Sequence, residues 1–193
     1  MTLEPVFVDP DVFTVSGILT VFECRALIER AESIGFAAAS VRTHSGPKMK
    51  TNIRNNDRVN FDNAKLANLM WSRVSSVLPM LDSLRPVSVD QRLRFYRYEP
   101  GQEFKRHKDG SVTNDHGHVS KLSYLIYLNS DFTGGATTFR DYVGSGESRR
   151  KIEHVITPET GSALLFRHER WHEGTGLTSG RKYVLRSDVF YGA

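Results

Sequence analysis

The sequence predicts an α+β fold, in which N-terminal helices support a double-stranded β-helix, or jelly-roll, core. Two segments before residue 87 have the helical spacing of apolar side chains, and from residue 87 onward short apolar stretches alternate with turn residues. Helices followed by many strands are typical of antiparallel sheets, and eight strands suit two packed sheets. We expect a single domain over residues 1–193, with helical support and a loop in 1–86 and the jelly-roll core in 87–193.

The first predicted helix follows two short apolar stretches, 6–8 and 12–15, which are bounded by prolines and a glycine and predict strands or extended arms. Thr20 and Glu23 form a capping-box pattern, which starts a helix by satisfying its free amide groups. Apolar side chains then recur at helical spacing, and Gly35 is suited to end the helix. We expect this helix to pack on a sheet.

A second helix is predicted from Asp62 or Asn63, either of which can cap its N-terminus. Its apolar side chains form a stripe that is expected to pack in the core, and Pro79 and Pro86 mark its end. The stripe comprises Leu66, Leu69, Met70, Val74, Val77, Leu78 and Leu81.

The polar segment 42–58 lies between the two predicted helices and is rich in basic residues. It predicts a long loop, and such loops frequently cover a binding site, although an ordinary exposed connection has the same composition. If the loop is a lid, its candidates for contact with a substrate are Arg54, Asp57 and Arg58.

Eight strands are predicted after residue 87, because turn residues such as Pro100-Gly101 and Gly134-Gly135 separate short apolar stretches. The predicted strands span about 88–98, 102–108, 119–129, 135–140, 152–157, 161–166, 170–174 and 181–191.

The composition limits the compartment and the kind of partner. Cys24 is the single cysteine, so no intramolecular disulfide can form, which favours a reducing compartment. The N-terminus does not have the pattern of a signal peptide, and no apolar run could span a bilayer, so we expect a cytoplasmic protein without a membrane partner. The formal net charge of +4 suits an anionic substrate or a nucleic acid, but no basic helix or basic aromatic sheet supports a nucleic-acid partner.

A candidate metal site begins with His107 and Asp109, which end the second predicted strand and would lie at the mouth of the barrel. Side chains two residues apart on an extended chain point to the same side, so the imidazole and the carboxylate share a face. His172 lies near the seventh predicted strand, which is close to the second in a jelly roll. Together these side chains predict the two-histidine, one-carboxylate arrangement that is typical of non-haem Fe(II) sites.

A candidate anion site is provided by Lys182, which opens the last predicted strand ten residues after His172. A cation inside an apolar barrel is costly unless an anion pairs with it, and an incoming dicarboxylate would do so. Tyr98 and Tyr127 could supply a hydroxyl to the same anion. Adjacent strand residues face opposite sides, so the alternative interpretation places Arg181 inside and Lys182 in solvent.

Four segments occur in a specific order between about residues 90 and 191: RYEPGQEFKRHKD, YLIYLN, GGATTF and WHEGTGLTSGRKYVLRSDVFY. In this ordered set the chain resembles the prolyl 4-hydroxylase-like Fe(II)/2-oxoglutarate dioxygenases. The resemblance implies iron ligands and 2-oxoglutarate contacts at stated positions of this sequence: His107, Asp109 and His172 for iron, and Lys182, Tyr98, Tyr127 and Thr137 for 2-oxoglutarate.

The resemblance also implies the reaction, which is hydroxylation of an unactivated C–H bond with dioxygen, Fe(II) and 2-oxoglutarate, and with ascorbate as an added reductant. A peptidyl residue, a free amino acid and a small metabolite all fit as substrates. The N-terminal half, which would meet the substrate, matches the family only in outline. Trp171, next to His172, is a further candidate for substrate contact.

Two other interpretations of the histidines are open. Residues 168–172 read H-E-x-x-H, the zinc peptidase signature, but this motif requires a helix, and Gly174 and Gly176 follow at once. His168 is then a surface residue or a neighbour of the site. The pair His116 and His118 could serve a cupin-like binding module, but a polar loop near the barrel mouth is the favoured explanation. For the whole chain, the alternative to an enzyme is a non-catalytic jelly-roll binding module that keeps the fold and has lost turnover.

Overall fold

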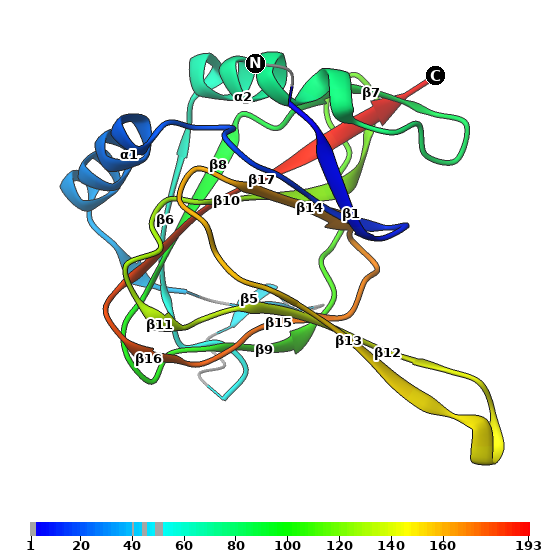
Figure 1. Ribbon diagram of the computed structural model, residues 1–193. Helices are drawn as coiled ribbons and strands as arrows, with labels where there is room; N and C mark the ends of the chain where they lie inside the picture. The colour runs from blue at the N-terminus through cyan, green and yellow to red at the C-terminus, as the bar shows by residue number, and fades with distance from the viewer. Residues whose placement is uncertain (1–2, 40, 44–45, 49–51) are drawn as a thin grey trace.

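The computed structural model describes residues 3–39, 41–43, 46–48 and 52–193. Two β-sheets face each other, and the two α-helices lie against the outer side of the larger sheet (Figure 1). The larger sheet and the smaller sheet together form the predicted double-stranded β-helix, so the predicted fold class is confirmed.

The larger sheet has nine strands, eight of which form one continuous path. In order along the path they are β1 (Pro5–Asp9), β2 (Val12–Val15), β14 (Ala163–Arg167), β10 (Val119–Tyr127), β17 (Lys182–Gly192), β8 (Arg92–Tyr98), β6 (Asp57–Asp62) and β3 (Ala37–Ala38). The ninth strand, β7 (Arg85–Val89), pairs with β17 off this path.

The smaller sheet has the order β13 (Arg150–Ile156), β12 (Thr137–Val143), β15 (His172–Gly174) and β9 (Phe104–His107). The hairpin of β12 and β13 extends well beyond the rest of the molecule (Figure 1). Two small sheets pair β11 (Thr133–Gly134) with β16 (Leu177–Ser179), and β4 (Val41–Thr43) with β5 (Gly46–Lys48).

Both faces of the larger sheet are buried, because alternate side chains of its strands enter two different cores. In β10, Tyr124 and Ile126 pack toward the helices, whereas Leu125 and Tyr127 point between the two sheets. The second core, between the sheets, therefore forms the interior of the barrel.

Helix α1 (Val21–Ile34) has the predicted capping box, in which Thr20 and Glu23 bond to each other's backbone amides. Arg73 of α2 (Ala64–Val74) also binds the Glu23 carboxylate at 2.7 Å and the Ile18 carbonyl at 2.8 Å. The N-cap of the first helix thus also fixes the second helix against it.

The second helix is shorter than predicted. Helix α2 is capped by Asn63 and ends at Val74, where a short 3-10 helix (Ser75–Val77) follows. Leu78 and Leu81 still pack against the core, but they belong to an irregular segment rather than to the helical stripe. The chain turns back here because Asp82 and Ser83 have positive φ angles, which a helix cannot contain.

Two predictions of strands and loops are corrected. The predicted strand 88–98 is divided into β7 and β8 by a turn at Asp90, whose carboxylate accepts a hydrogen bond from the Arg92 amide. The predicted loop 42–58 contains described strands at both ends, and β6 joins the larger sheet beside β8. The N-terminal part of the chain therefore supplies strands as well as helices, while its division from the core at residue 86 stays a prediction.

No α-helix in the described parts of the chain combines the length and the apolar character that a bilayer crossing requires. The single cysteine, Cys24, is a buried free thiol in α1, and burial raises its pKa to about 11.

The turn before β14 generates a prediction about stability. Gly161 has a φ of +80°, and a Cβ at this position would collide with the Leu19 carbonyl. Replacing Gly161 by Ala should lower the free energy of unfolding by about 3 kcal/mol or more, because left-handed strain and overpacking add. Gly101, with a φ of +83° and no atom within 4 Å of such a Cβ, is the matched control.

Urea denaturation of Gly161→Ala and Gly101→Ala would test this comparison. The control should lose only about 1–2 kcal/mol, the cost of the left-handed conformation alone. Equal losses in the two variants would show that contact with Leu19 does not constrain this turn.

Candidate metal centre

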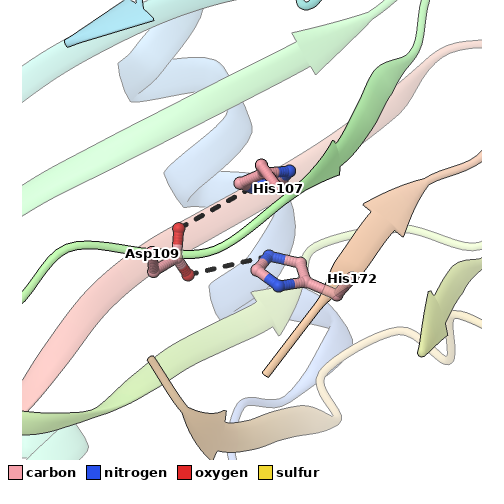
Figure 2. Close-up of side chains that lie close together, drawn as sticks. All are labelled: His107, Asp109 and His172. Atoms are coloured by element: carbon pink, nitrogen blue, oxygen red, sulfur yellow. Dashed lines mark ion pairs between the residues drawn. The ribbon is translucent and has the colours of Figure 1, made fainter. Parts of the chain in front are cut away.

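Two neighbouring strands of the smaller sheet bring two histidines together. His107, the last residue of β9, lies opposite His172, the first residue of β15, and their ring centroids are 4.2 Å apart. Asp109 follows β9 by two residues, and its amide donates to the His168 carbonyl at 2.9 Å. Figure 2 shows the three side chains pointing toward one another, with each histidine Nε2 3.7 Å from an Asp109 carboxylate oxygen.

The backbone sets the orientation of both rings. The Nδ1 atom of His107 lies 2.7 Å from the Lys105 carbonyl, and that of His172 lies 2.9 Å from the Arg170 carbonyl. A carbonyl only accepts hydrogen bonds, so each Nδ1 carries the proton and each Nε2 keeps a free lone pair. One ligand atom from each of the three side chains lies within 4.8 Å of the others, which is the spacing that a single ion requires.

Burial keeps the two histidines neutral. It lowers the pKa of His107 to about 3, with a further contribution from His172, and it lowers the pKa of His172 as well. A metal binds neutral imidazole, so this environment favours a metal over a proton.

The Asp109 carboxylate remains ionised although its side chain is only 4% exposed. Burial alone would raise its pKa, but Arg186, at 2.7 Å, and the two histidines lower it well below its usual range. Ser123 of β10 donates to the other carboxylate oxygen at 2.5 Å. Each oxygen is therefore fixed by one donor and retains a lone pair toward the histidines.

A buried chain of hydrogen bonds supports Ser123. Its hydroxyl accepts from His168 Nδ1 at 2.9 Å, and His168 Nε2 accepts from the Ser120 hydroxyl at 2.9 Å. His168 is 4% exposed, so it is a neighbour of the site rather than a surface residue. Residues 168–170 form a turn, not a helix, and the H-E-x-x-H zinc peptidase interpretation is therefore wrong.

Lys182 lies in a pocket that the three metal candidates also line. It is 3% exposed, and its ammonium group donates to the Gly135 carbonyl at 2.5 Å and lies over the rings of Tyr98 and Tyr127 at 5.3 and 5.4 Å. No carboxylate among the described residues pairs with it, and burial lowers its pKa to about 7. Arg181 points outward and binds Glu99 at 2.6 Å, so the alternative with Arg181 inside is wrong.

The metal candidates and the lysine line one pocket. In this pocket the Tyr127 and Thr137 hydroxyls form a hydrogen bond of 2.7 Å with each other. The lining includes every candidate for iron and 2-oxoglutarate binding. The sequence did not indicate the other lining residues, which are Tyr96, Phe104, Leu125, Gly174, Val184 and Arg186.

The candidates for substrate contact lie in different places. Arg54 is buried against Tyr96 and Phe104, two rings of the pocket lining. Asp57 binds Arg97 at 2.9 Å and does not line the pocket.

Arg58 is half-buried in β6 opposite Tyr96 of β8, but it is not among the lining residues either. Trp171 is 41% exposed and lies under the side chains of Arg106 and Lys108, which are exposed as well, and none of the three lines the pocket. Contact of Asp57 or Trp171 with a substrate inside the pocket is therefore not supported.

Two important residues of the site were missed in the sequence. Tyr96 precedes Tyr98 by two positions, and Arg186 follows Lys182 by four, so the period of a strand places each on the pocket face. This strand period could be read from the sequence, but the pairing of Arg186 with the buried Asp109 carboxylate is visible only in the structure.

Within the described residues, His107, Asp109 and His172 form the one group of three or more potential metal ligands that is close enough for a single ion. The His116 and His118 rings are 6.0 Å apart in a surface loop and are not part of such a group. Two imidazoles, one carboxylate and a buried unpaired lysine in a jelly roll define the class of non-haem Fe(II) and 2-oxoglutarate proteins.

The chain matches the model of the 2OG-Fe(II) oxygenase superfamily over residues 93–187, which contain every candidate iron and 2-oxoglutarate residue. It is an Fe(II)- and 2-oxoglutarate-dependent oxygenase that uses dioxygen, as the resemblance implied. No curated protein sequence matches the chain.

Three solved structures have the same fold, although their sequences are less than 20% identical to this chain. A Pseudomonas putida prolyl-4-hydroxylase has a TM-score of 0.65 and 19% identity over 93% of this chain and 92% of its own. A viral collagen prolyl hydroxylase from Paramecium Bursaria Chlorella virus-1, as its 2OG complex, has a TM-score of 0.62 and 19% identity over 93% and 95%.

The third is a Trichoplax adhaerens prolyl hydroxylase in complex with a peptide fragment of the hypoxia inducible factor oxygen degradation domain. Its TM-score is 0.67, and it is 16% identical over 93% of this chain and 83% of its own. At these identities the likeness is one of fold.

The Arg186–Asp109 pair leads to a prediction about stability. In the metal-free protein, Arg186→Met should lower the free energy of unfolding by about 3–5 kcal/mol, because it leaves a buried carboxylate without its cation. Arg181→Met, which breaks an ion pair of a half-exposed arginine, should cost no more than about 1 kcal/mol.

Urea denaturation of the two single variants and of Arg186→Met/Asp109→Asn would measure these costs. The double variant should recover part of the loss, since the uncompensated charge is removed with its partner. A double variant that is less stable than Arg186→Met would contradict this account of Asp109.

Proposed function

We propose that His107, Asp109 and His172 bind one Fe(II) ion and that the chain hydroxylates an unactivated C–H bond of its substrate. The observation that carries this proposal is the convergence of two free Nε2 atoms and one ionised carboxylate in a pocket that also contains a buried unpaired lysine. When bound, Fe(II) and 2-oxoglutarate activate dioxygen, which converts the cosubstrate to succinate and carbon dioxide and adds one oxygen atom to the substrate.

We propose that Lys182 binds the far carboxylate of 2-oxoglutarate. Its ammonium group has one carbonyl partner and two aromatic faces, so an incoming carboxylate would supply the missing charge. The Tyr127 and Thr137 hydroxyls, which bond to each other, can turn a donor toward the same carboxylate, and Tyr98 covers the site.

The protein's own contribution is positioning and exclusion of water. Backbone carbonyls fix both imidazoles, and Arg186 and Ser123 fix the carboxylate, so little reorganises when the metal binds. The apolar side chains of the lining, Phe104, Leu125 and Val184, exclude water from part of the pocket, which limits side reactions with water.

The substrate class stays open among a peptidyl residue, a free amino acid and a small metabolite. The similar solved structures favour a prolyl substrate, since all three are prolyl hydroxylases and one holds a peptide fragment. We also propose a reducing compartment, the cytoplasm, on the basis of the single cysteine. Succinate formation on addition of iron and 2-oxoglutarate, screened against prolyl peptides and free amino acids, would separate an active enzyme from a non-catalytic binding module.

Removal of a ligand should abolish turnover without unfolding the protein. His107→Ala and Asp109→Ala should each lower iron-dependent succinate formation by more than about 100-fold, since even outer partners of a metal typically cost about 10- to 100-fold. His116→Ala, which removes an exposed histidine of a surface loop, should keep full activity. Iron binding and circular dichroism should be measured together with succinate, and full activity in either ligand variant would refute the assignment.

The affinity for 2-oxoglutarate should fall as the pH rises. The free enzyme's Lys182 has a pKa of about 7, and only the ammonium form attracts a carboxylate. Above pH 7 the dissociation constant should therefore increase by up to about tenfold per pH unit. Lys182→Arg, whose guanidinium stays charged, should remove this dependence even if its affinity is lower.

Calorimetric titrations between pH 6 and 9 with a redox-inert divalent metal would test this dependence, and Arg181→Met is the matched control. The control should keep the wild-type pH profile, because Arg181 points away from the pocket. Parallel profiles for the wild type and Lys182→Arg would assign the pH dependence to another group.

A further inference from the structure

A second buried cation without an anionic partner lies beside the pocket. Arg54 is 4% exposed, and its guanidinium is stacked between the rings of Tyr96 and Phe104, at 4.2 and 4.4 Å from their centroids. Both rings also line the pocket of the metal centre. Arg54 is held there by a bridge between its backbone and that of Phe104 in β9.

The hydrogen bonds of Arg54 are incomplete. Its Nε donates to the Asn56 side chain at 2.6 Å, but its Nη2 is buried without a hydrogen-bond partner. Asn56 is neutral, and no ion pair involves Arg54 among the described residues. Segment 40–51, whose side chains are not described, contains no Asp or Glu, so it cannot supply the missing carboxylate. A buried guanidinium in this state is unfavourable until an anion binds it.

Two other arginines on this side of the barrel have carboxylate partners. Arg186 binds Asp109 and Asp188, and Arg94 binds Asp188 at 3.0 Å. Arg54, next to Tyr96, has no such carboxylate partner among the described residues.

We propose that Arg54 is the specificity-determining residue of the substrate site and that the substrate carries an oxyanion, a carboxylate or a phosphate, which binds its Nη2. The planar guanidinium, stacked between two rings and fixed at Nε, presents its remaining N–H groups in one plane, the geometry that an oxyanion requires. This assignment rests on the function proposed above, and it narrows the substrates to acidic ones.

The oxyanion needs a route to Nη2, which has no contact with solvent in this structure. Phe104 is half-buried and covers one face of the guanidinium, so turning its side chain opens Arg54 to the pocket. Phe104 also stacks on His107 with a centroid distance of 3.5 Å. Binding of the acidic group is therefore adjacent to a metal-centre side chain and orients the rest of the substrate toward it.

Anion binding can be measured without turnover. The wild type, Arg54→Met and Arg54→Lys would be loaded with a redox-inert divalent metal and saturating 2-oxoglutarate, which occupies Lys182, and then titrated by calorimetry with acetate or with inorganic phosphate. Arg54→Met should lose at least about tenfold in affinity for the preferred anion, and Arg54→Lys should lose less. Arg92→Met, which removes an exposed arginine of β8, should bind as the wild type does.

The two anions identify the source of the oxyanion. Preference for acetate indicates a carboxylate substrate, and preference for phosphate indicates a phosphorylated one. Equal affinity of the wild type and both Arg54 variants for both anions would overturn the proposal. Thermal unfolding shows whether Arg54→Met is folded. If Arg54→Met is unfolded, the anion affinity of Arg54→Lys, which keeps the charge, is compared with that of the wild type instead.

Turnover separates this proposal from the proposed function. Matched peptides that contain glutamate or glutamine would be screened for hydroxylated product and succinate. The wild type should prefer the acid, and Arg54→Met should lose this preference while its KM for 2-oxoglutarate is unchanged. No preference for acid in an active wild type would refute the role of Arg54 alone, whereas no succinate under any condition would refute the oxygenase function itself.

Discussion

The ionised carboxylate of Asp109, buried at the meeting point of the two sheets, is the interaction on which the rest of the site depends. An isolated buried carboxylate costs several kcal/mol, and here Arg186 of β17 and Ser123 of β10 compensate it. Its own amide is fixed by the carbonyl of His168, after β14. Four segments that are distant in the chain must therefore be in register before this group is stable.

The same register creates the pocket. Strand β17 lies between β10 and β8, and its inward side chains at Lys182 and Arg186 are two strand periods apart. The first residue of the strand, Lys182, thus supplies the buried cation without a carboxylate partner. Arg186, further along the strand, supplies the cation that binds the Asp109 carboxylate. A slip of one residue would turn both cations outward and would replace them with Arg181 and Leu185.

The sequence predicted those parts of the fold whose signals are local. Alternation and turn residues located the strands of the core, and a capping box located α1, because these patterns act within a few residues. The end of α2 and the strand β6 were not predicted, since the packing of the irregular segment after the helix and the pairing of β6 with β8 depend on tertiary contacts.

The site shows the same division. His107 and Asp109 share a face by local geometry, the expected neighbourhood of the second and seventh strands added His172, and the resemblance to a family added Thr137. The chain from His168 through Ser123 to Asp109 could not be predicted, because its members become neighbours only when β10 and β14 pair. Polar residues that support a metal ligand have no sequence spacing of their own.

The buried cations of the barrel fall into two groups that have different roles. Arg186 and Arg94 have carboxylates of the chain as partners, so their energy is already balanced in the free protein and they stabilise the fold. Lys182 and Arg54 have only neutral hydrogen-bond acceptors and aromatic faces, so each becomes favourable only when an anion arrives from outside. Two such cations around one metal centre are the physical basis of our proposal that the chain binds two anions, the cosubstrate at Lys182 and the substrate at Arg54.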